Sequence, residues 1–246
     1  MVVDYSLAFD AVTFAREALG IAPDVRQAEI LRSRANRGIL NCSRQWGKST
    51  ITAAMAVHRA WFEPGSLVLA LSPTARQSGE FMDKVWSFAR RLEVKKRGDG
   101  HNAMSQAFPN GSRIVGLPGM QDYVRGFSKV SLALIDEAAR VPDDLFFAVQ
   151  PMLARSGGDF WLMSTPAGRR GFFWREWNKP ERWTRFAVPA TECERIPAEV
   201  LEEGREMLGE RLFRQEYMCE FGDDEDALFS SALLGRVLDR DAEGLR

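Results

Sequence analysis

The sequence predicts an α/β fold with a mainly parallel central sheet flanked by helices on both faces. Short apolar runs alternate along the chain with segments whose apolar residues recur at helical spacing, which is typical of a parallel sheet covered by helices. The runs at 130–135 and 159–164 are mostly apolar, as strands buried on both faces are. A glycine-containing loop joins a further apolar run, Gly38-Ile39-Leu40, to a helical segment.

In the first half of the chain, apolar spacing predicts a helix over residues 5–20, which Gly20 ends, and a second helix over 23–34. A strand at 37–42, a helix over 49–61, a strand at 66–71 and a helix over 74–91 follow. Alternating residues on both sides of Pro109-Asn110-Gly111 predict a hairpin of 104–108 and 112–117.

In the second half, strands are predicted at 130–135, 159–164 and 184–188. Helices are predicted over about 143–154, 172–177 and 197–214, and the last of these is broken near Gly209. No internal repeat and no low-complexity stretch interrupts this order, so one α/β domain accounts for the pattern.

Composition limits the class of protein. The 246 residues suffice for one substantial core, and no apolar run reaches the length of a membrane span. No secretory signal is visible, and the three cysteines match no zinc pattern, so a reducing cytosol is expected. The net charge of −1 argues neither for nor against nucleic acid.

The segment 41–50 has the pattern of a phosphate-binding (Walker A) loop in which Cys42 replaces the first glycine. Successive backbone N–H groups and the positive end of the next helix would hold a phosphate tail, and Gly47 permits their close approach. Lys48 would place its charge on the β- and γ-phosphates, and the Ser49 hydroxyl would join the Mg²⁺ shell. The alternative is a chance Gly-Lys-Ser sequence at the start of a helix.

Two carboxylates follow the buried run at 130–135. Asp136 could hold Mg²⁺, directly or through water, and Glu137 could polarise the attacking water. The alternative is a buried strand followed by a solvated turn. Together the loop and the carboxylate pair predict a P-loop NTPase of the ASCE/RecA-like kind.

The run at 159–164 leads to Ser164, Thr165 and Pro166, which would lie at the carboxyl edge of the sheet. The two hydroxyls could sense the γ-phosphate and pass that information to the next loop. A plain strand-to-helix turn with a hydroxyl cap is the alternative.

In this order and spacing, the motifs resemble the ATPase domain of the large terminase subunit of tailed bacteriophages. "CSRQWGKST" resembles the variant phosphate loop of that family, "LALIDEAARVPDDLF" its acidic strand and "WLMSTPAGRRGFFW" its coupling motif. "RQAEIL" resembles the adenine-contacting segment, "YVRGFS" the segment before the acidic strand, and "EYMCEFGDDEDALFS" the bridge into a second domain. The resemblance covers about Pro23 to Ser231.

The resemblance implies roles for particular residues. It implies that Glu137 is the catalytic carboxylate (Walker B), that Ser49 and Asp136 hold the metal, and that Ser164, Thr165 and Pro166 couple hydrolysis to movement. Gln27 would read the adenine edge, although a helix-surface amide is an even competitor. The nucleotide-binding set is Gln27, Ser43, Arg44, Gln45, Trp46, Gly47, Lys48, Ser49 and Thr50.

Two arginines are candidates for charge stabilisation. Arg44, inside the loop, could reach the γ-phosphate of its own subunit. The resemblance implies that Arg125 is an arginine finger offered to the nucleotide of a neighbouring subunit, and a surface arginine is the alternative.

Residues 1–222 are therefore expected to form the ATPase domain. Residues 223–246 are expected to be an acidic linker that begins the bridge to a nuclease domain, which the family normally carries and this sequence lacks. Nuclease activity is not expected from this chain.

The function implied is ATP-driven DNA translocation that packages a viral genome into a procapsid, with ATP and Mg²⁺ as cofactors. Double-stranded DNA, a portal protein and a small terminase subunit are the implied partners, in the bacterial host cytoplasm. A homo-oligomeric ring is implied for the assembled motor, and a monomer in isolation remains open. The rivals are a helicase-like ATPase dependent on nucleic acid and a remnant that binds nucleotide without turnover.

Overall fold

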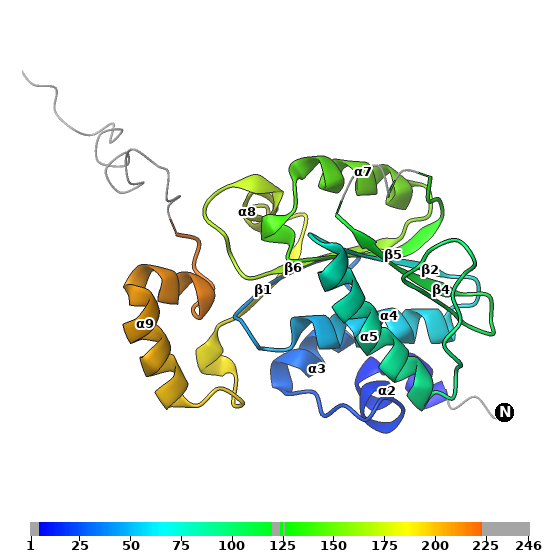
Figure 1. Ribbon diagram of the computed structural model, residues 1–246, viewed down its shortest axis with the longest axis horizontal. Helices are drawn as coiled ribbons and strands as arrows, with labels where there is room; N and C mark the ends of the chain where they lie inside the picture. Colours follow the sequence, from blue (N-terminus) through cyan, green and yellow to red (C-terminus); the bar gives the residue numbers. More distant parts are fainter. Residues whose placement is uncertain (1–4, 120–123, 125, 223–246) are drawn as a thin grey trace, which may run out of the picture.

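A seven-stranded sheet forms the centre of the computed structural model, which describes residues 5–119, 124 and 126–222. The strand order is β3-β4-β2-β5-β6-β1-β7, and every neighbouring pair is parallel except β3 with β4 (Figure 1). The strands are β1 (Arg37–Cys42), β2 (Leu67–Ser72), β3 (Ser105–Ala107), β4 (Arg113–Pro118), β5 (Val130–Asp136), β6 (Asp159–Ser164) and β7 (Thr184–Val188). The predicted α/β class with a mainly parallel sheet is confirmed.

Helices cover both faces of the sheet (Figure 1). One face carries α2 (Ala11–Glu17), α3 (Val25–Arg32), α4 (Lys48–Phe62) and α5 (Ala75–Arg91), preceded by the short α1 (Tyr5–Phe9). The other face carries α7 (Asp143–Ala154) and α8 (Gly171–Trp177). Beyond the β1 side of the sheet, α9 (Ala198–Glu216) follows β7, and 3-10 turns occupy Ala138–Arg140 and Ala190–Glu192.

The alternation of side chains along β5 shows how the two faces are filled. Leu132 and Leu134 belong to the core shared with α4 and α5, whereas Ala133 and Ile135 belong to the core shared with α7. All four are buried, because both faces of the strand are covered. The nearly continuous apolar run in the sequence is the consequence.

The predicted helix over residues 5–20 is wrong in one respect, because the structure divides it in two. Asp10 is extended and caps α2, and its carboxylate accepts hydrogen bonds from Val12 N–H at 3.0 Å and Thr13 Oγ1 at 2.9 Å. An aspartate in this position competes with helix continuation by satisfying N–H groups of the next helix. The hairpin of β3 and β4 and the break of α9 at Gly209, where φ is 71°, are confirmed.

The parallel register brings the ends of four strands to one edge. Leu71 of β2 is paired with Ile135 of β5, Asp136 with Met163 of β6, and Asn41 of β1 with Ser164. The loops after these strands therefore begin side by side. Ligands of doubly wound sheets bind at this carboxyl edge.

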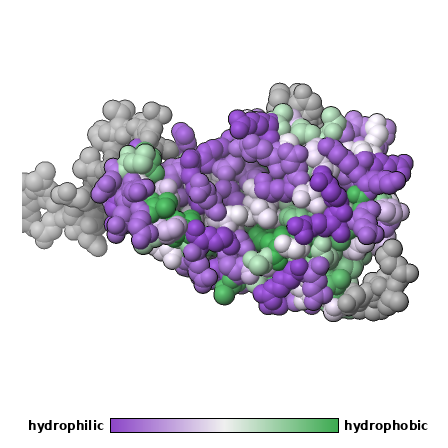
Figure 2. Space-filling model, turned by 60° about the horizontal axis from the view of Figure 1, so that its bottom comes forward, coloured by the Kyte–Doolittle hydropathy of each residue, from purple (hydrophilic) through white to green (hydrophobic). Residues whose placement is uncertain are grey.

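The face of the molecule seen in Figure 2 is mostly hydrophilic, with small apolar areas between polar side chains. Among the described residues, no helix combines the length and the apolar character needed to cross a membrane.

Candidate nucleotide site

The loop between β1 and α4 presents a row of backbone N–H groups. Gln45 and Gly47 have left-handed backbone conformations, with φ of 60° and 100°. Within the part of the chain that the structure describes, the N–H groups of residues 45–49 have no hydrogen-bond acceptor. They lie at the N-terminus of the fifteen-residue α4, whose dipole favours an anion there. The loop is therefore built to hold phosphate.

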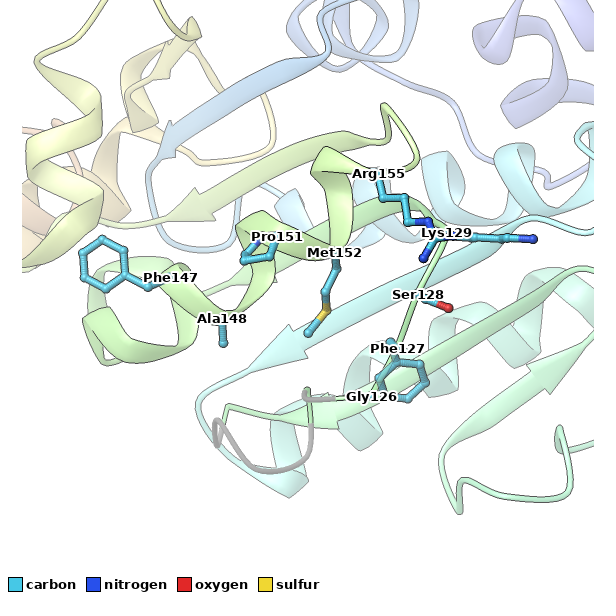
Figure 3. Close-up of a pocket in the computed structure, with 9 residues that line it drawn as sticks. All are labelled: Gly126, Phe127, Ser128, Lys129, Phe147, Ala148, Pro151, Met152 and Arg155. Atoms are coloured by element: carbon cyan, nitrogen blue, oxygen red, sulfur yellow. The ribbon is translucent and has the colours of Figure 1, made fainter.

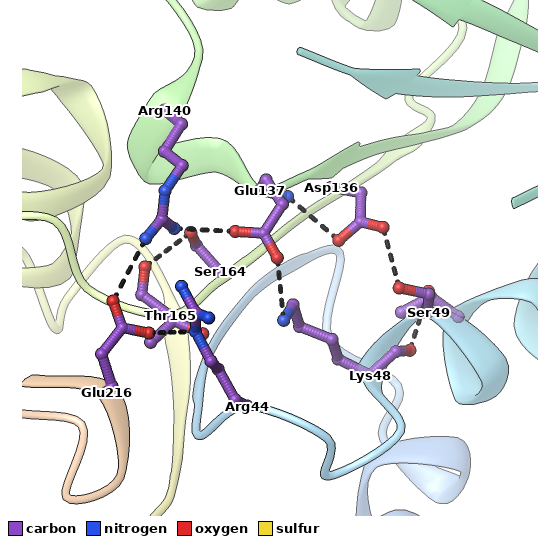
Figure 4. A network of polar contacts seen from close by, with 10 residues as sticks. Arg44, Lys48, Ser49, Asp136, Glu137, Arg140, Ser164, Thr165 and Glu216 are labelled. Atoms are coloured by element: carbon purple, nitrogen blue, oxygen red, sulfur yellow. Dashed lines mark hydrogen bonds and ion pairs between the residues drawn. The ribbon is translucent and has the colours of Figure 1, made fainter. Parts of the chain in front are cut away.

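Strand β5 places its two terminal carboxylates against this loop (Figure 4). The Lys48 ammonium lies 2.9 Å from Oε1 of Glu137. The Ser49 hydroxyl donates to Oδ2 of Asp136 at 2.8 Å. The two motifs predicted from separate parts of the sequence thus meet through direct contacts.

Asp136 lies almost buried, at 8% exposure. Burial raises the pKa of this carboxyl group, and the charge of Lys48 opposes that rise. Its Oδ1 accepts the Glu137 N–H at 3.0 Å and its Oδ2 faces Ser49. A buried carboxylate beside a hydroxyl is the oxygen donor set by which Mg²⁺ is held together with substrate phosphates. The residues present therefore fit that metal.

Glu137 has a left-handed backbone, with φ of 51° and ψ of 42°, directly after the strand. Such a conformation is uncommon outside glycine and costs about 1 kcal/mol or more, which neighbouring contacts must offset. Its carboxylate contacts Lys48 on one oxygen, and Arg140 at 2.9 Å on the other. The carboxylate is held between two cations at the mouth of the loop.

The ion-pair network continues to the end of α9. Arg140 also contacts Glu216 at 3.4 Å, and Glu216 in turn pairs with Arg44 of the loop (Figure 4). The Arg44 N–H additionally donates to the Glu216 carbonyl at 3.2 Å. The predicted phosphate-binding arginine thus lies against a carboxylate of α9. Nothing in the spacing of the sequence connects Arg140 or Glu216 to the loop, so the sequence-based list missed both.

Gln27 lies inside the protein at 4% exposure, rather than on a helix surface. Its side-chain oxygen accepts from Asp24 N–H at 3.2 Å in a capping box, and its Nε2 donates to the Trp46 carbonyl at 3.0 Å. Arg195, which the sequence did not single out, donates to the same carbonyl at 2.6 Å. Gln27 therefore joins the start of α3 to the phosphate loop.

The remaining predicted loop residues surround this centre. Ser43 and Trp46 are fully buried, whereas Gln45 is exposed and Thr50 is half-buried. Ser164, Thr165 and Pro166 are buried at the end of β6, and Ser164 Oγ donates to the Thr165 carbonyl at 2.7 Å. Arg125 and residues 223–246 lie outside the described residues, so the finger and the linker stay predictions.

An apolar pocket lies elsewhere, between α7 and residues 126–129 (Figure 3). It has a volume of about 500 Å³, and Phe127, Phe147, Pro151 and Met152 supply apolar lining. None of the residues that line it belongs to the ion-pair network. The phosphate loop and the pocket are therefore separate features.

A parallel sheet, a loop of free N–H groups before a helix, and a carboxylate pair on a neighbouring strand define a P-loop NTPase. The family described as "Terminase large subunit, T4likevirus-type, N-terminal" matches residues 39–236, and the chain belongs to this family.

Known proteins agree with this assignment. The large terminase subunit of Thermus virus P23-45 is 27% identical over 267 residues, which cover 94% of this chain and 55% of that protein. The chain thus spans about half the length of the curated relatives that it matches.

Two solved structures share the fold. The large terminase ATPase domain of Thermus phage P74-26 superimposes with a TM-score of 0.72 at 24% identity, covering 84% of this chain and 96% of that one. The large terminase of a thermophilic bacteriophage, solved in complex with ADP, gives 0.67 at 13% identity and covers 87% and 52%.

Proposed function

We propose that this chain is an ATP-hydrolysing, DNA-translocating motor domain that powers packaging of a viral genome into a procapsid. One observation carries the proposal: Lys48 and Ser49, at the start of α4, contact Glu137 and Asp136, at the end of β5, beside a row of free N–H groups. This is the set of groups that phosphoryl transfer from a nucleoside triphosphate needs.

The residues have distinct tasks in that reaction. The N–H groups of residues 45–49 hold the phosphate tail, and Lys48 leaves Glu137 to contact the β- and γ-phosphates. The freed Glu137 carboxylate orients the attacking water and accepts its proton, while Arg140 keeps the carboxylate in place. Arg44 reaches the γ-phosphate once it leaves Glu216.

The metal fits the same site. Mg²⁺, when bound at Ser49 and Asp136, supplies positive charge that neutralises the phosphate oxygens. Asp136 is nearly buried and close to two cation-attracting oxygens, so it is suited to that charge.

Further parts of the proposal rest on the family. Arg125 would act as a finger on the nucleotide of a neighbouring subunit in a homo-oligomeric ring. Double-stranded DNA, a portal protein and a small terminase subunit would be the partners, in the bacterial host cytoplasm. Ser164, Thr165 and Pro166 would pass the state of the γ-phosphate to the next loop. No nuclease activity is expected of residues 1–222.

The test is steady-state ATPase activity measured across protein concentration, with and without duplex DNA. Turnover per subunit should rise steeply with concentration if a finger is donated between subunits. Lys48→Ala should abolish nucleotide binding, whereas Lys84→Ala, on α5 away from the site, should not.

Two results would overturn the proposal. Duplex unwinding by the isolated chain would favour a helicase-like ATPase instead. Tight nucleotide binding without turnover, even with DNA at high protein concentration, would favour a remnant that only binds nucleotide.

A further inference from the structure

Buried hydroxyl groups without a hydrogen-bond partner gather at one edge of the sheet. Among the described residues, the side-chain hydroxyls that are buried and lack a partner are those of Ser43, Ser72 and Thr165. Ser43 follows β1, Ser72 ends β2 and Thr165 follows β6, so all three lie at the carboxyl edge. A buried hydroxyl without a partner costs about 1–3 kcal/mol. A ligand or an ordered water is the ordinary explanation for such groups.

Ser72 is the member of this set that no motif predicted. It is fully buried, and its carbonyl accepts the Gly119 N–H at 2.6 Å, so only its hydroxyl is unsatisfied. The strand and the loop that surround it are therefore fixed by backbone contacts, and the hydroxyl is not needed to hold them.

The register brings Ser72 next to Asp136. Leu71 of β2 is paired with Ile135 of β5, so the next position on each strand is Ser72 and Asp136. Their predecessors alternate together: Ala70 and Leu134 face the α4 side, and Leu71 and Ile135 face the α7 side. Ser72 and Asp136 thus share the α4 side, where Ser49 contacts Asp136.

The two groups are neighbours without touching. Adjacent strands are about 4.8 Å apart, and Asp136 directs its oxygens to Ser49 and to the Glu137 N–H rather than to Ser72. One water bridges such a separation. Mg²⁺ bound by one carboxylate and substrate phosphates keeps several of its waters, and those waters need acceptors and donors in the protein.

We propose that Ser72 is a positioning residue that holds a water of the Mg²⁺ shell on the β2 side of Asp136. This inference rests on the proposed function, because it requires that the site bind nucleotide with Mg²⁺. Ser72 does not contact phosphate in this arrangement. Its contribution should therefore be visible only when the metal is present.

The experiment measures ADP binding by calorimetry, and thermal unfolding, with MgCl₂ and separately with EDTA. Ser72→Ala should weaken ADP binding about 2–12-fold in Mg²⁺, the worth of one hydrogen bond, and leave binding in EDTA unchanged. The unfolding midpoint of the protein without ligand should stay the same or rise, because an unsatisfied buried hydroxyl is removed. Ser72→Thr keeps the hydroxyl and should restore Mg²⁺-dependent binding.

Ser78→Ala is the matched control. Ser78 is equally buried, but its hydroxyl donates to the Leu117 carbonyl at 2.8 Å. Its removal should lower the unfolding midpoint and leave the effect of Mg²⁺ on ADP binding intact.

Each other outcome has a definite meaning. If Ser72→Ala keeps the full Mg²⁺ effect, the inference fails, and a lowered midpoint without ligand would assign Ser72 a structural water instead. If the parent protein binds no ADP under either condition, the proposed function fails, which is a separate result.

Discussion

The Lys48 ammonium lies 2.9 Å from the Glu137 carboxylate, so the cation expected to bind phosphate and the carboxylate expected to activate water form an ion pair with each other. A phosphate that enters the loop must compete with Glu137 for Lys48. The same contact therefore limits affinity for nucleotide and keeps the carboxylate near the reacting group.

Glu137→Gln should separate these two effects. Turnover should fall about 10²–10⁴-fold because the general base is lost. Affinity for ATP should rise about two- to fivefold, since Lys48 no longer has a charged partner in the loop. Calorimetry and single-turnover hydrolysis measure the two quantities, and Glu63→Gln, on the exposed pair with Arg59, serves as control. Unchanged turnover would contradict the assigned role.

Glu216→Gln should release Arg44 and Arg140 from their shared carboxylate. Because the Arg44 side chain is 62% exposed, the gain in ATP affinity should be modest, about two- to fivefold. Glu220→Gln breaks the surface pair with Arg214 and should leave the affinity unchanged. Weaker ATP binding in Glu216→Gln would mean that the pair positions Arg44 rather than withholding it.

Gln27→Ala should destabilise the domain by about 1–3 kcal/mol, because a buried amide and the Trp46 carbonyl lose their contact and the capping box of α3 is broken. Chemical denaturation measures this. Gln77 occupies the corresponding helix position after the N-cap Thr74, yet contacts no carbonyl of the phosphate loop, so Gln77→Ala should cost less. If Gln27 also reads adenine, the preference for ATP over GTP should fall in Gln27→Ala alone.

Gly38→Ala should destabilise the sheet by roughly 1–3 kcal/mol or more. An added Cβ would lie 2.3 Å from the Trp161 ring, which stacks on Phe186 and cannot retreat freely. Gly79→Ala, inside α5, provides a control of opposite sign: its Cβ would meet only Met104 Sδ at 3.9 Å. That variant should gain about 0.5–1 kcal/mol, because alanine favours a helix interior. Unfolding midpoints that move in the same direction would contradict this reading.

Asp99 should make stability depend on acid pH. Burial alone would raise its pKa, but hydrogen bonds from Asn102, His101 N–H and Ser105 lower the pKa from 3.8 to about 2. The carboxylate therefore contributes stability that is complete above about pH 4 and is lost as the pH falls through about 2.

Asp99→Asn should reduce the free energy of unfolding by about 2 kcal/mol at pH 7, and the difference should shrink toward pH 2. Asp83→Asn, on the exposed side of α5, is the control. A difference that does not depend on pH would contradict the assignment.

Much of the fold was predictable because its signals are local. Gly47 to Ser49 and Asp136-Glu137 each lie on a short stretch in which the strand, loop and helix order is visible in the sequence. Parallel sheets bring such strand ends together, so the meeting of Lys48 with Glu137 could be anticipated.

The partners from distant segments could not be anticipated. Glu216 reaches Arg44 across 172 positions of sequence, and its place depends on how α9 packs rather than on any pattern nearby. Ser72 has an ordinary residue type for a strand end, and only the missing hydrogen-bond partner distinguishes it. The division at Asp10 was visible as an N-cap signal, but the continuous apolar spacing concealed it.

The backbone after α9 is fastened to the strand that enters the phosphate loop. Asn41 of β1 donates its side-chain amide to the Cys219 carbonyl at 2.7 Å, the Ala190 N–H donates to the Tyr217 carbonyl at 2.7 Å, and the Arg44 N–H donates to the Glu216 carbonyl at 3.2 Å. Tension applied to the polypeptide beyond these contacts would be carried first by them and delivered to residues 41–44. A mechanical load and a phosphate group would then act on the same few residues, which gives this motor a direct route for exchanging force with chemistry.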